Sequence, residues 1–122
     1  MNNNIRLLYV EDEEDILEIA ECALEDEGFD LLFCKSGHEA LEKAEAFSPD
    51  IILLDVMMSG MDGPTTLKNL RKIAGFENIP ALFLTAKVQA KEVESLLEFG
   101  AIKVIHKPFD VMTLADQIKD AL

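Results

Sequence analysis

The sequence predicts a doubly wound α/β fold, a three-layer sandwich in which five helices cover a five-stranded parallel sheet. Short apolar runs alternate with segments of helical periodicity from end to end, and this alternation is typical of a parallel sheet covered by helices. The apolar runs are continuous, as expected for strands buried on both faces. The length of 122 residues, 49% of them hydrophobic, suits one domain spanning residues 1–122.

Five apolar runs mark the predicted strands, and a polar residue follows each of them. The predicted strands are residues 7–10, 31–34, 51–54, 81–84 and 104–105. Between and after them, apolar residues recur three and four positions apart, which is the spacing of one face of a helix. The five sets are residues 16, 19, 20, 23 and 24; 40, 41, 44 and 47; 67, 70 and 74; 93, 96 and 97; and 114, 115, 118 and 122.

Residues typical of helix ends agree with this division. Ser36 and Glu39 form a predicted capping box for the second helix. Pro64 suits the first turn of the third helix, and Asp110 can cap the fifth. Glycines stand where the first, third and fourth helices are expected to end, at Gly28, Gly75 and Gly100.

The net charge excludes several partners. Eleven lysines and arginines against 24 acidic residues give a charge of −13, and the basic residues are scattered along the chain. Nucleic acids and anionic membranes attract clustered Lys and Arg, so we expect this chain to bind neither. No apolar run reaches the ~20 residues that span a bilayer, and the first four residues lack the pattern of a signal peptide. We therefore expect a cytoplasmic protein, with Cys22 and Cys34 as buried, reduced thiols.

The polar residues that end the predicted strands carry the candidate chemistry. In a doubly wound sheet, ligands bind beyond the carboxyl ends of the strands. Glu11 and Asp12 end the first strand and Asp55 the third, while Thr85 ends the fourth and Lys107 the fifth. Converging carboxylates repel one another unless a cation lies between them, and a set of hard oxygen ligands suits Mg²⁺. With a lysine and a hydroxyl added, the group can accept a phosphoryl group on a carboxylate.

Each of these residues also has a plainer structural interpretation. The acidic residues 11–15 suit the first turn of a helix. Asp55 can be a turn residue, and the Thr85 hydroxyl can bond to the backbone at a strand end. The phosphoryl-accepting interpretation is favoured because four separate strand ends supply compatible groups.

The sequence resembles the receiver domains of two-component response regulators over essentially its whole length. The matching segments are residues 8–13, 53–58, 60–63, 84–86, 100–101 and 107–109. The resemblance implies the flavodoxin-like strand order 2-1-3-4-5. It also implies that the chain is a signalling switch and not an enzyme, beyond catalysing its own phosphorylation and dephosphorylation.

The resemblance implies a role for each matching residue. Asp55 is the implied phosphoacceptor, and it binds Mg²⁺ together with Glu11, Asp12 and the backbone carbonyl of Met57; Mn²⁺ can substitute. The implied phosphoryl donor is a phosphohistidine of a sensor histidine kinase or a histidine phosphotransfer domain.

Further residues would contact the phosphoryl group. The resemblance implies that Thr85 is the switch hydroxyl, that the backbone N–H of Ala86 binds a phosphoryl oxygen, and that Lys107 precedes a cis bond to Pro108. The implied output is contact with a downstream protein, with a phosphorylation-dependent dimer as one form of it. No DNA-binding segment follows the last predicted helix, so we expect output by protein contact.

Two positions depart from the family pattern. Ser59 stands where proline usually follows the two methionines, so the loop after Asp55 is expected to be less rigid. Val104 stands where receivers that switch through an aromatic ring carry Tyr or Phe. We therefore do not expect the usual coupled movement of threonine and ring here.

Two other functions fit the predicted architecture. A flavodoxin-like electron carrier needs a phosphate cradle after the first strand, where the acidic residues 11–14 would repel a phosphate. An aspartyl-phosphate phosphatase needs a second acid two residues after its nucleophile, and that position is Met57. A bound yellow chromophore would favour the electron carrier.

Overall fold

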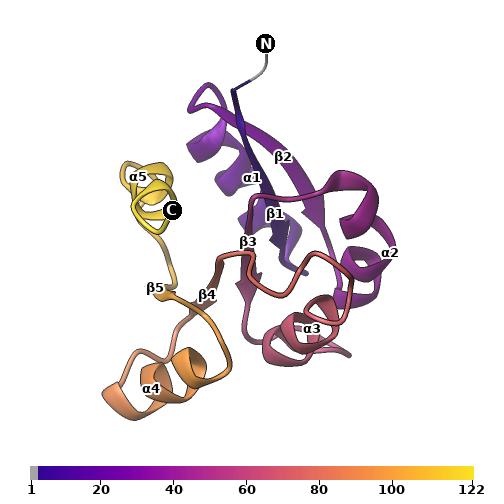
Figure 1. The fold of residues 1–122 in the computed structure, drawn as a ribbon. Helices are drawn as coiled ribbons and strands as arrows, with labels where there is room; N and C mark the ends of the chain where they lie inside the picture. Colours follow the sequence, from indigo (N-terminus) through magenta and orange to yellow (C-terminus); the bar gives the residue numbers. More distant parts are fainter. Residues whose placement is uncertain (1–2) are drawn as a thin grey trace.

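Five parallel strands form one sheet in the order β2-β1-β3-β4-β5 within residues 3–122, the part of the chain that the computed structural model describes (Figure 1). The predicted strand order is confirmed. The first two residues of the predicted domain and of the opening segment lie outside the described residues. The strands are β1 (Ile5–Val10), β2 (Phe29–Cys34), β3 (Ile51–Asp55), β4 (Ala81–Thr85) and β5 (Lys103–His106).

Helices cover both faces of the sheet, because side chains alternate along each strand. On one face, Leu7 and Tyr9 of β1 share a core with α1 and α5. On the other face, Leu8 and Val10 share a core with α2, α3 and α4. The helices are α1 (Glu14–Leu24), α2 (Gly37–Phe47), α3 (Gly63–Leu70), α4 (Ala90–Glu98) and α5 (Leu114–Lys119).

The helix starts follow the predicted signals except at α5. The Ser36 hydroxyl accepts the N–H of Glu39 at 3.0 Å, as in the predicted capping box. The Glu39 carboxylate, however, accepts the N–H of Lys35 and not that of Ser36. Pro64 lies in the first turn of α3, as predicted. The prediction that Asp110 caps the fifth helix is wrong. Its carboxylate accepts the N–H of Met112 inside a turn that precedes the helix.

Two of the three predicted glycine ends are displaced. The helix α4 ends at Glu98, and Gly100 follows with a φ of +111°, as expected for a glycine just beyond a helix. In contrast, α1 ends at Leu24 and α3 at Leu70, several residues before Gly28 and Gly75. Turns fill both intervals, and the glycines adopt positive φ at the ends of these turns.

Several side chains expected on inner helix faces are exposed, among them Ala74, Leu97 and Leu122. Cys22 lies on the outer side of α1, so only the prediction for Cys34, which is buried, is confirmed. Ile19 is 49% exposed because Leu17, Ala20 and Leu24 form the inner face of α1. Each residue advances about 100° around a helix, which places Ile19 away from the centre of that face.

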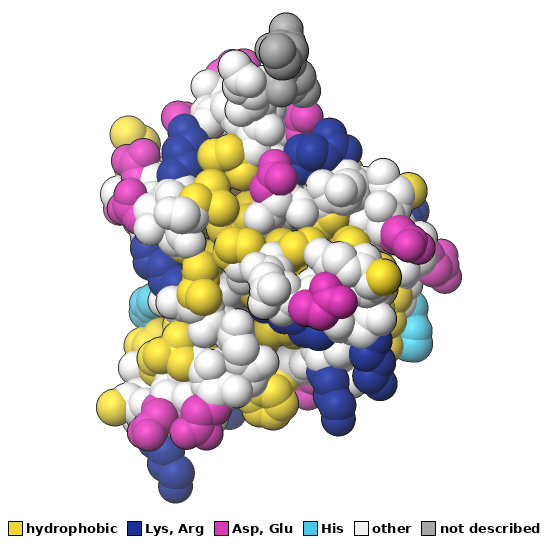
Figure 2. All heavy atoms as spheres, viewed as in Figure 1, with side chains coloured by type: hydrophobic (Ala, Val, Ile, Leu, Met, Phe, Trp, Pro, Cys, Tyr) yellow, Lys and Arg dark blue, Asp and Glu magenta, His cyan; other side chains and the backbone are white. Residues whose placement is uncertain are grey.

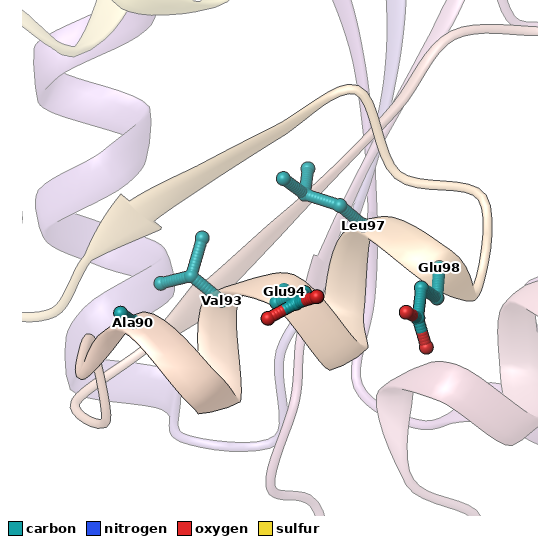
Figure 3. Close-up of a pocket in the computed structure, with 5 residues that line it drawn as sticks. All are labelled: Ala90, Val93, Glu94, Leu97 and Glu98. Atoms are coloured by element: carbon teal, nitrogen blue, oxygen red, sulfur yellow. The ribbon is translucent and has the colours of Figure 1, made fainter.

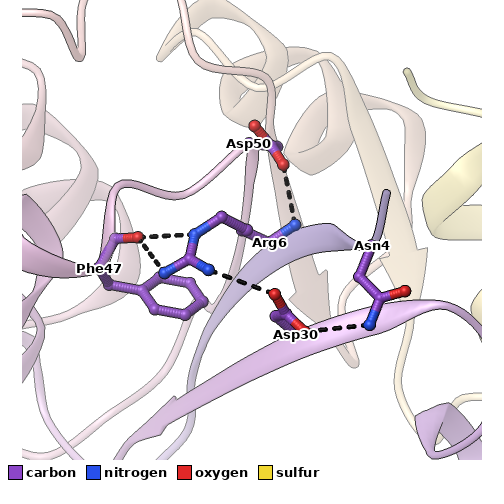
Figure 4. A network of polar contacts seen from close by, with 5 residues as sticks. All are labelled: Asn4, Arg6, Asp30, Phe47 and Asp50. Atoms are coloured by element: carbon purple, nitrogen blue, oxygen red, sulfur yellow. Dashed lines mark hydrogen bonds and ion pairs between the residues drawn. The ribbon is translucent and has the colours of Figure 1, made fainter. Parts of the chain in front are cut away.

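Arg6 makes several polar contacts at the end of the sheet opposite to the carboxyl ends of the strands (Figure 4). Its guanidinium donates to the carbonyl of Phe47 and to the carboxylate of Asp30, and it lies 4.4 Å from the centre of the Phe47 ring. Its backbone N–H donates to Asp50. The polar groups at this edge are thus engaged in joining β1, β2 and the end of α2.

The surface agrees with the scattered charge of the sequence. On the face shown in Figure 2, lysine and arginine side chains lie at separate places among acidic ones. Within residues 3–122, none of the helices has the length and apolar character needed to cross a membrane.

Candidate functional site

The carboxyl ends of β1, β3, β4 and β5 bring the predicted site residues together. Glu11 follows β1, Asp55 ends β3, Thr85 ends β4 and Lys107 follows β5. Glu11, Asp55 and Thr85 are nearly completely buried, with exposed fractions of 0%, 2% and 4%. Parallel pairing of the strands places all four groups at one edge, as the sequence predicts.

The ammonium group of Lys107 bridges two buried carboxylates. Its Nζ lies 2.9 Å from Oε1 of Glu11 and 3.0 Å from Oδ2 of Asp55. Burial alone would lower the pKa of Lys107, but the two carboxylates outweigh it and the pKa lies above its usual value. Burial raises the pKa of Glu11 to about 7, against the lowering effect of Lys107. One cation therefore serves two carboxylates that are both removed from water.

Three carboxylates lie close enough to share a metal ion. One oxygen each from Glu11, Asp12 and Asp55 lies within 4.8 Å of the others. The backbone N–H of Glu13 donates to Oε2 of Glu11 at 3.2 Å, and that of Ser59 donates to Oδ2 of Asp12 at 2.9 Å. The three acids exceed the single charge of Lys107, so this edge carries an excess negative charge. Clustered oxygen ligands with excess negative charge fit a hard divalent cation.

Thr85 and the two residues after it line the same cavity as Asp55. The Thr85 hydroxyl accepts the N–H of Lys87 at 3.0 Å, so it makes the backbone contact that a threonine with a purely structural role would make. The proton of this hydroxyl is still able to donate a hydrogen bond. A cavity of about 380 Å³ opens between the strand ends and is lined by Glu13, Asp55, Met57, Thr85, Ala86, Lys87, Lys107 and Pro108. The Lys107–Pro108 bond is cis, as the resemblance implies. Asp55 therefore borders a cavity that a small anionic group can enter.

The loop after Asp55 is held by its backbone and by one buried methionine. The N–H of Val56 donates to the carbonyl of Leu84, and the side chain of Met58 lies in the core. The side chain of Met57, in contrast, is 66% exposed. A β-carbon on Gly63 would lie 2.4 Å from the carbonyl oxygen of Asp55, so the close return of the loop requires glycine at this position.

Val104 lies on β5 and is partly buried against the core beneath α4. Its register partner is Phe83, two residues before Thr85 on β4. The neighbouring helix α4 carries a groove of about 530 Å³ on its surface, lined by Ala90, Val93, Glu94, Leu97 and Glu98 (Figure 3). Figure 3 shows Val93 and Leu97 on one side of the helix and the Glu98 carboxylate pointing away from them.

Two contacts were absent from the sequence-based site. Lys107 pairs with Glu11 as well as with Asp55, because Glu11 follows β1 at the same edge of the sheet. Ser59 was noted as a departure, but its N–H binds Asp12. Serine has a backbone N–H and proline has none. The serine at position 59 was therefore the sequence signal for this hydrogen bond.

Comparison with known proteins assigns the family. The family model of the response regulator receiver domain matches residues 7–119. The transcriptional regulatory protein PhoP of alkaline phosphatase synthesis from Bacillus subtilis is 38% identical over 119 residues, covering 98% of this chain and 49% of PhoP. The transcriptional regulatory protein CseB of Streptomyces coelicolor is 35% identical, covering 100% of this chain and 51% of CseB. The chain spans about half the length of these curated relatives.

The fold is also shared with solved structures. The structure of the chemotaxis response regulator CheY4 of Vibrio cholerae has a TM-score of 0.92 and 28% sequence identity, and the match covers 98% of this chain and 100% of CheY4. These findings favour the signalling interpretation over the electron carrier and the phosphatase. The chain belongs to the family of response regulator receiver domains.

Proposed function

We propose that residues 1–122 act as one phosphoacceptor domain in which Asp55 receives a phosphoryl group from a phosphohistidine of a sensor kinase or phosphotransfer domain. The position of Lys107 between Asp55 and Glu11, beside a cavity, carries this proposal. A carboxylate oxygen of Asp55 bonds to phosphorus while the bond from phosphorus to the imidazole nitrogen breaks. The imidazole leaves with the electron pair of that bond and takes up a proton.

Glu11, Asp12 and Asp55 would hold Mg²⁺, with the backbone carbonyl of Met57 as a further ligand; Mn²⁺ would substitute. The oxygens of the three acids lie within 4.8 Å of one another, which supports this set. A bound Mg²⁺ would neutralise charge on the transferred phosphoryl group. Lys107 contributes a second positive charge from the side of β5.

The added phosphoryl charge would change the contacts of Thr85. Its hydroxyl would donate to a phosphoryl oxygen, and the N–H of Ala86 would bind another. The loop that Thr85 now holds through Lys87 would then move with the start of α4. The groove of α4 with its exposed Leu97 is the surface that would pass the change to a downstream protein or a second copy of the chain.

We infer the partners of the whole protein from its family, because the chain spans about half the length of its curated relatives. PhoP and CseB are described as transcriptional regulators. Because the charge is −13 and the basic residues are scattered, we propose that these 122 residues do not bind DNA directly. We propose a cytoplasmic location, where a kinase can reach Asp55.

Mg²⁺-dependent labelling by a small phosphodonor tests the proposed function. Acetyl phosphate is expected to phosphorylate the chain in Mg²⁺ or Mn²⁺ and not in excess chelator, because the metal and Lys107 must together neutralise the incoming charge. The stoichiometry is measured by intact-mass spectrometry. Equal labelling with and without the metal would contradict the proposal.

Val104 is expected to leave β5 nearly unresponsive to phosphorylation. Valine is smaller than an aromatic residue and stiff about its side-chain torsion, so it offers no ring that can move inward. Adding beryllofluoride and Mg²⁺ should shift the backbone amide signals of residues 85–93 strongly and those around Val104 weakly. Equal shifts in both segments would contradict this. Val104→Tyr should change partner affinity and preserve labelling of Asp55.

A further inference from the structure

A hydrogen bond between a backbone N–H and a side chain joins two loops beside the three clustered carboxylates. The N–H of Ser59, in the loop after β3, donates to Oδ2 of Asp12, in the loop after β1, at 2.9 Å. The loop around Ser59 is fixed on both sides. Met58 is 9% exposed and belongs to the core, and the N–H of Gly63 donates to the carbonyl of Val56.

The Asp12 carboxylate is held by this backbone hydrogen bond, whereas Lys107 holds its two neighbours. Glu11 is held by Lys107 and by the N–H of Glu13, and Asp55 is held by Lys107. Among residues 3–122, Ser59 is the one that donates a hydrogen bond to the Asp12 carboxylate. Asp12 is also only partly buried, so packing constrains its side chain less.

The donor exists because residue 59 is not proline. Proline, the usual residue at this position, has no backbone N–H and could not donate to Asp12. An N–H bonded to one carboxylate oxygen fixes the rotamer of Asp12 and leaves its other oxygen free to coordinate a cation. Groups that orient metal ligands from outside affect metal affinity by about 10–100-fold when they are removed.

We propose that the backbone N–H of Ser59 is a positioning group for the divalent cation site, holding the Asp12 carboxylate toward Glu11 and Asp55. The inference rests on the proposed Mg²⁺ site. Ser59 itself does not coordinate the cation, and its hydroxyl has no part in this role. The apparent loss of loop rigidity at Ser59 is offset by a bond that ties the loop to β1.

Two variants separate the backbone donor from the side chain. Ser59→Pro removes the N–H, and Ser59→Ala keeps it and removes only the hydroxyl. Mg²⁺ titrations by calorimetry are expected to show about 10-fold weaker binding for Ser59→Pro. Ser59→Ala is expected to bind as the original chain does. Equal Mg²⁺ affinity of the two variants would overturn the inference while leaving the metal site intact.

Amide hydrogen exchange in the metal-free protein gives a readout that needs no variant at position 59. The Ser59 amide is expected to be protected in the original chain and to lose that protection in Asp12→Ala. Glu11→Gln, which leaves Asp12 in place, is expected to retain it. An unprotected Ser59 amide in the original chain would overturn the inference, even if Ser59→Pro fails to fold. Absence of Mg²⁺ binding by the original chain would overturn the proposed function itself.

Discussion

Asp55→Asn is expected to reduce labelling by acetyl phosphate to background. The substitution keeps the size of the side chain and removes the carboxylate that attacks phosphorus. Asp55 is 2% exposed and borders the cavity where the donor would enter. Glu13 also lines this cavity, but of these two acids Asp55 is the one that pairs with Lys107. Intact-mass spectrometry after incubation with the donor and Mg²⁺ measures the effect.

Asp116→Asn is the matched control for this variant. Asp116 lies on the exposed side of α5 and does not line the cavity at Asp55, and its substitution removes the same charge. The control should label like the original chain. Labelling of Asp55→Asn at the level of Asp116→Asn would show that another residue accepts the phosphoryl group.

Glu11→Gln is expected to stabilise the metal-free protein at pH 8 by roughly 3 kcal/mol. Burial raises the folded-state pKa of Glu11 from its ordinary value of 4.5 to about 7. The folded state therefore holds the proton more tightly than the unfolded state, and the associated stability is complete below about pH 4.5. It is lost as the pH rises through about 7, because an ionised carboxylate must then stay buried beside Asp55. Glutamine avoids this loss.

Urea denaturation in excess chelator at pH 5 and pH 8 tests this prediction. The stability difference between Glu11→Gln and the original chain should be large at pH 8 and small at pH 5. Adding Mg²⁺ should stabilise the original chain and not the variant, since the variant lacks one of the proposed ligands. A difference that does not change with pH would contradict a raised pKa at Glu11.

The sequence predicted the sheet and the meeting of the strand ends well, for a physical reason. Continuous apolar runs such as residues 51–54 have few alternatives to a strand buried on both faces, and parallel pairing then aligns their carboxyl ends. Helix limits were less predictable. Asp110 can cap a turn as well as a helix, and Gly28 can end a turn that follows a helix. Local patterns do not distinguish these cases.

The contacts within the site were predicted less completely than its members. Strand ends specify which side chains share an edge, but the partner of each polar atom depends on loop geometry. The bond from Ser59 to Asp12 joins residues 47 positions apart, and no local pattern contains it. The exposure of Met57 likewise depends on the path of the loop, since the adjacent Met58 has the same side chain and is buried.

Chemical mapping of the phosphorylated residue tests the central claim most directly. The chain is incubated with acetyl phosphate and Mg²⁺, acyl phosphates are reduced with borohydride, and peptides are sequenced by mass spectrometry. Reduction converts a phosphorylated aspartate to homoserine and thereby marks its position. The account predicts homoserine at position 55 alone, dependent on the metal. Conversion at Asp12 instead of Asp55, or phosphate found on one of the two histidines with Asp55 unmodified, would contradict it.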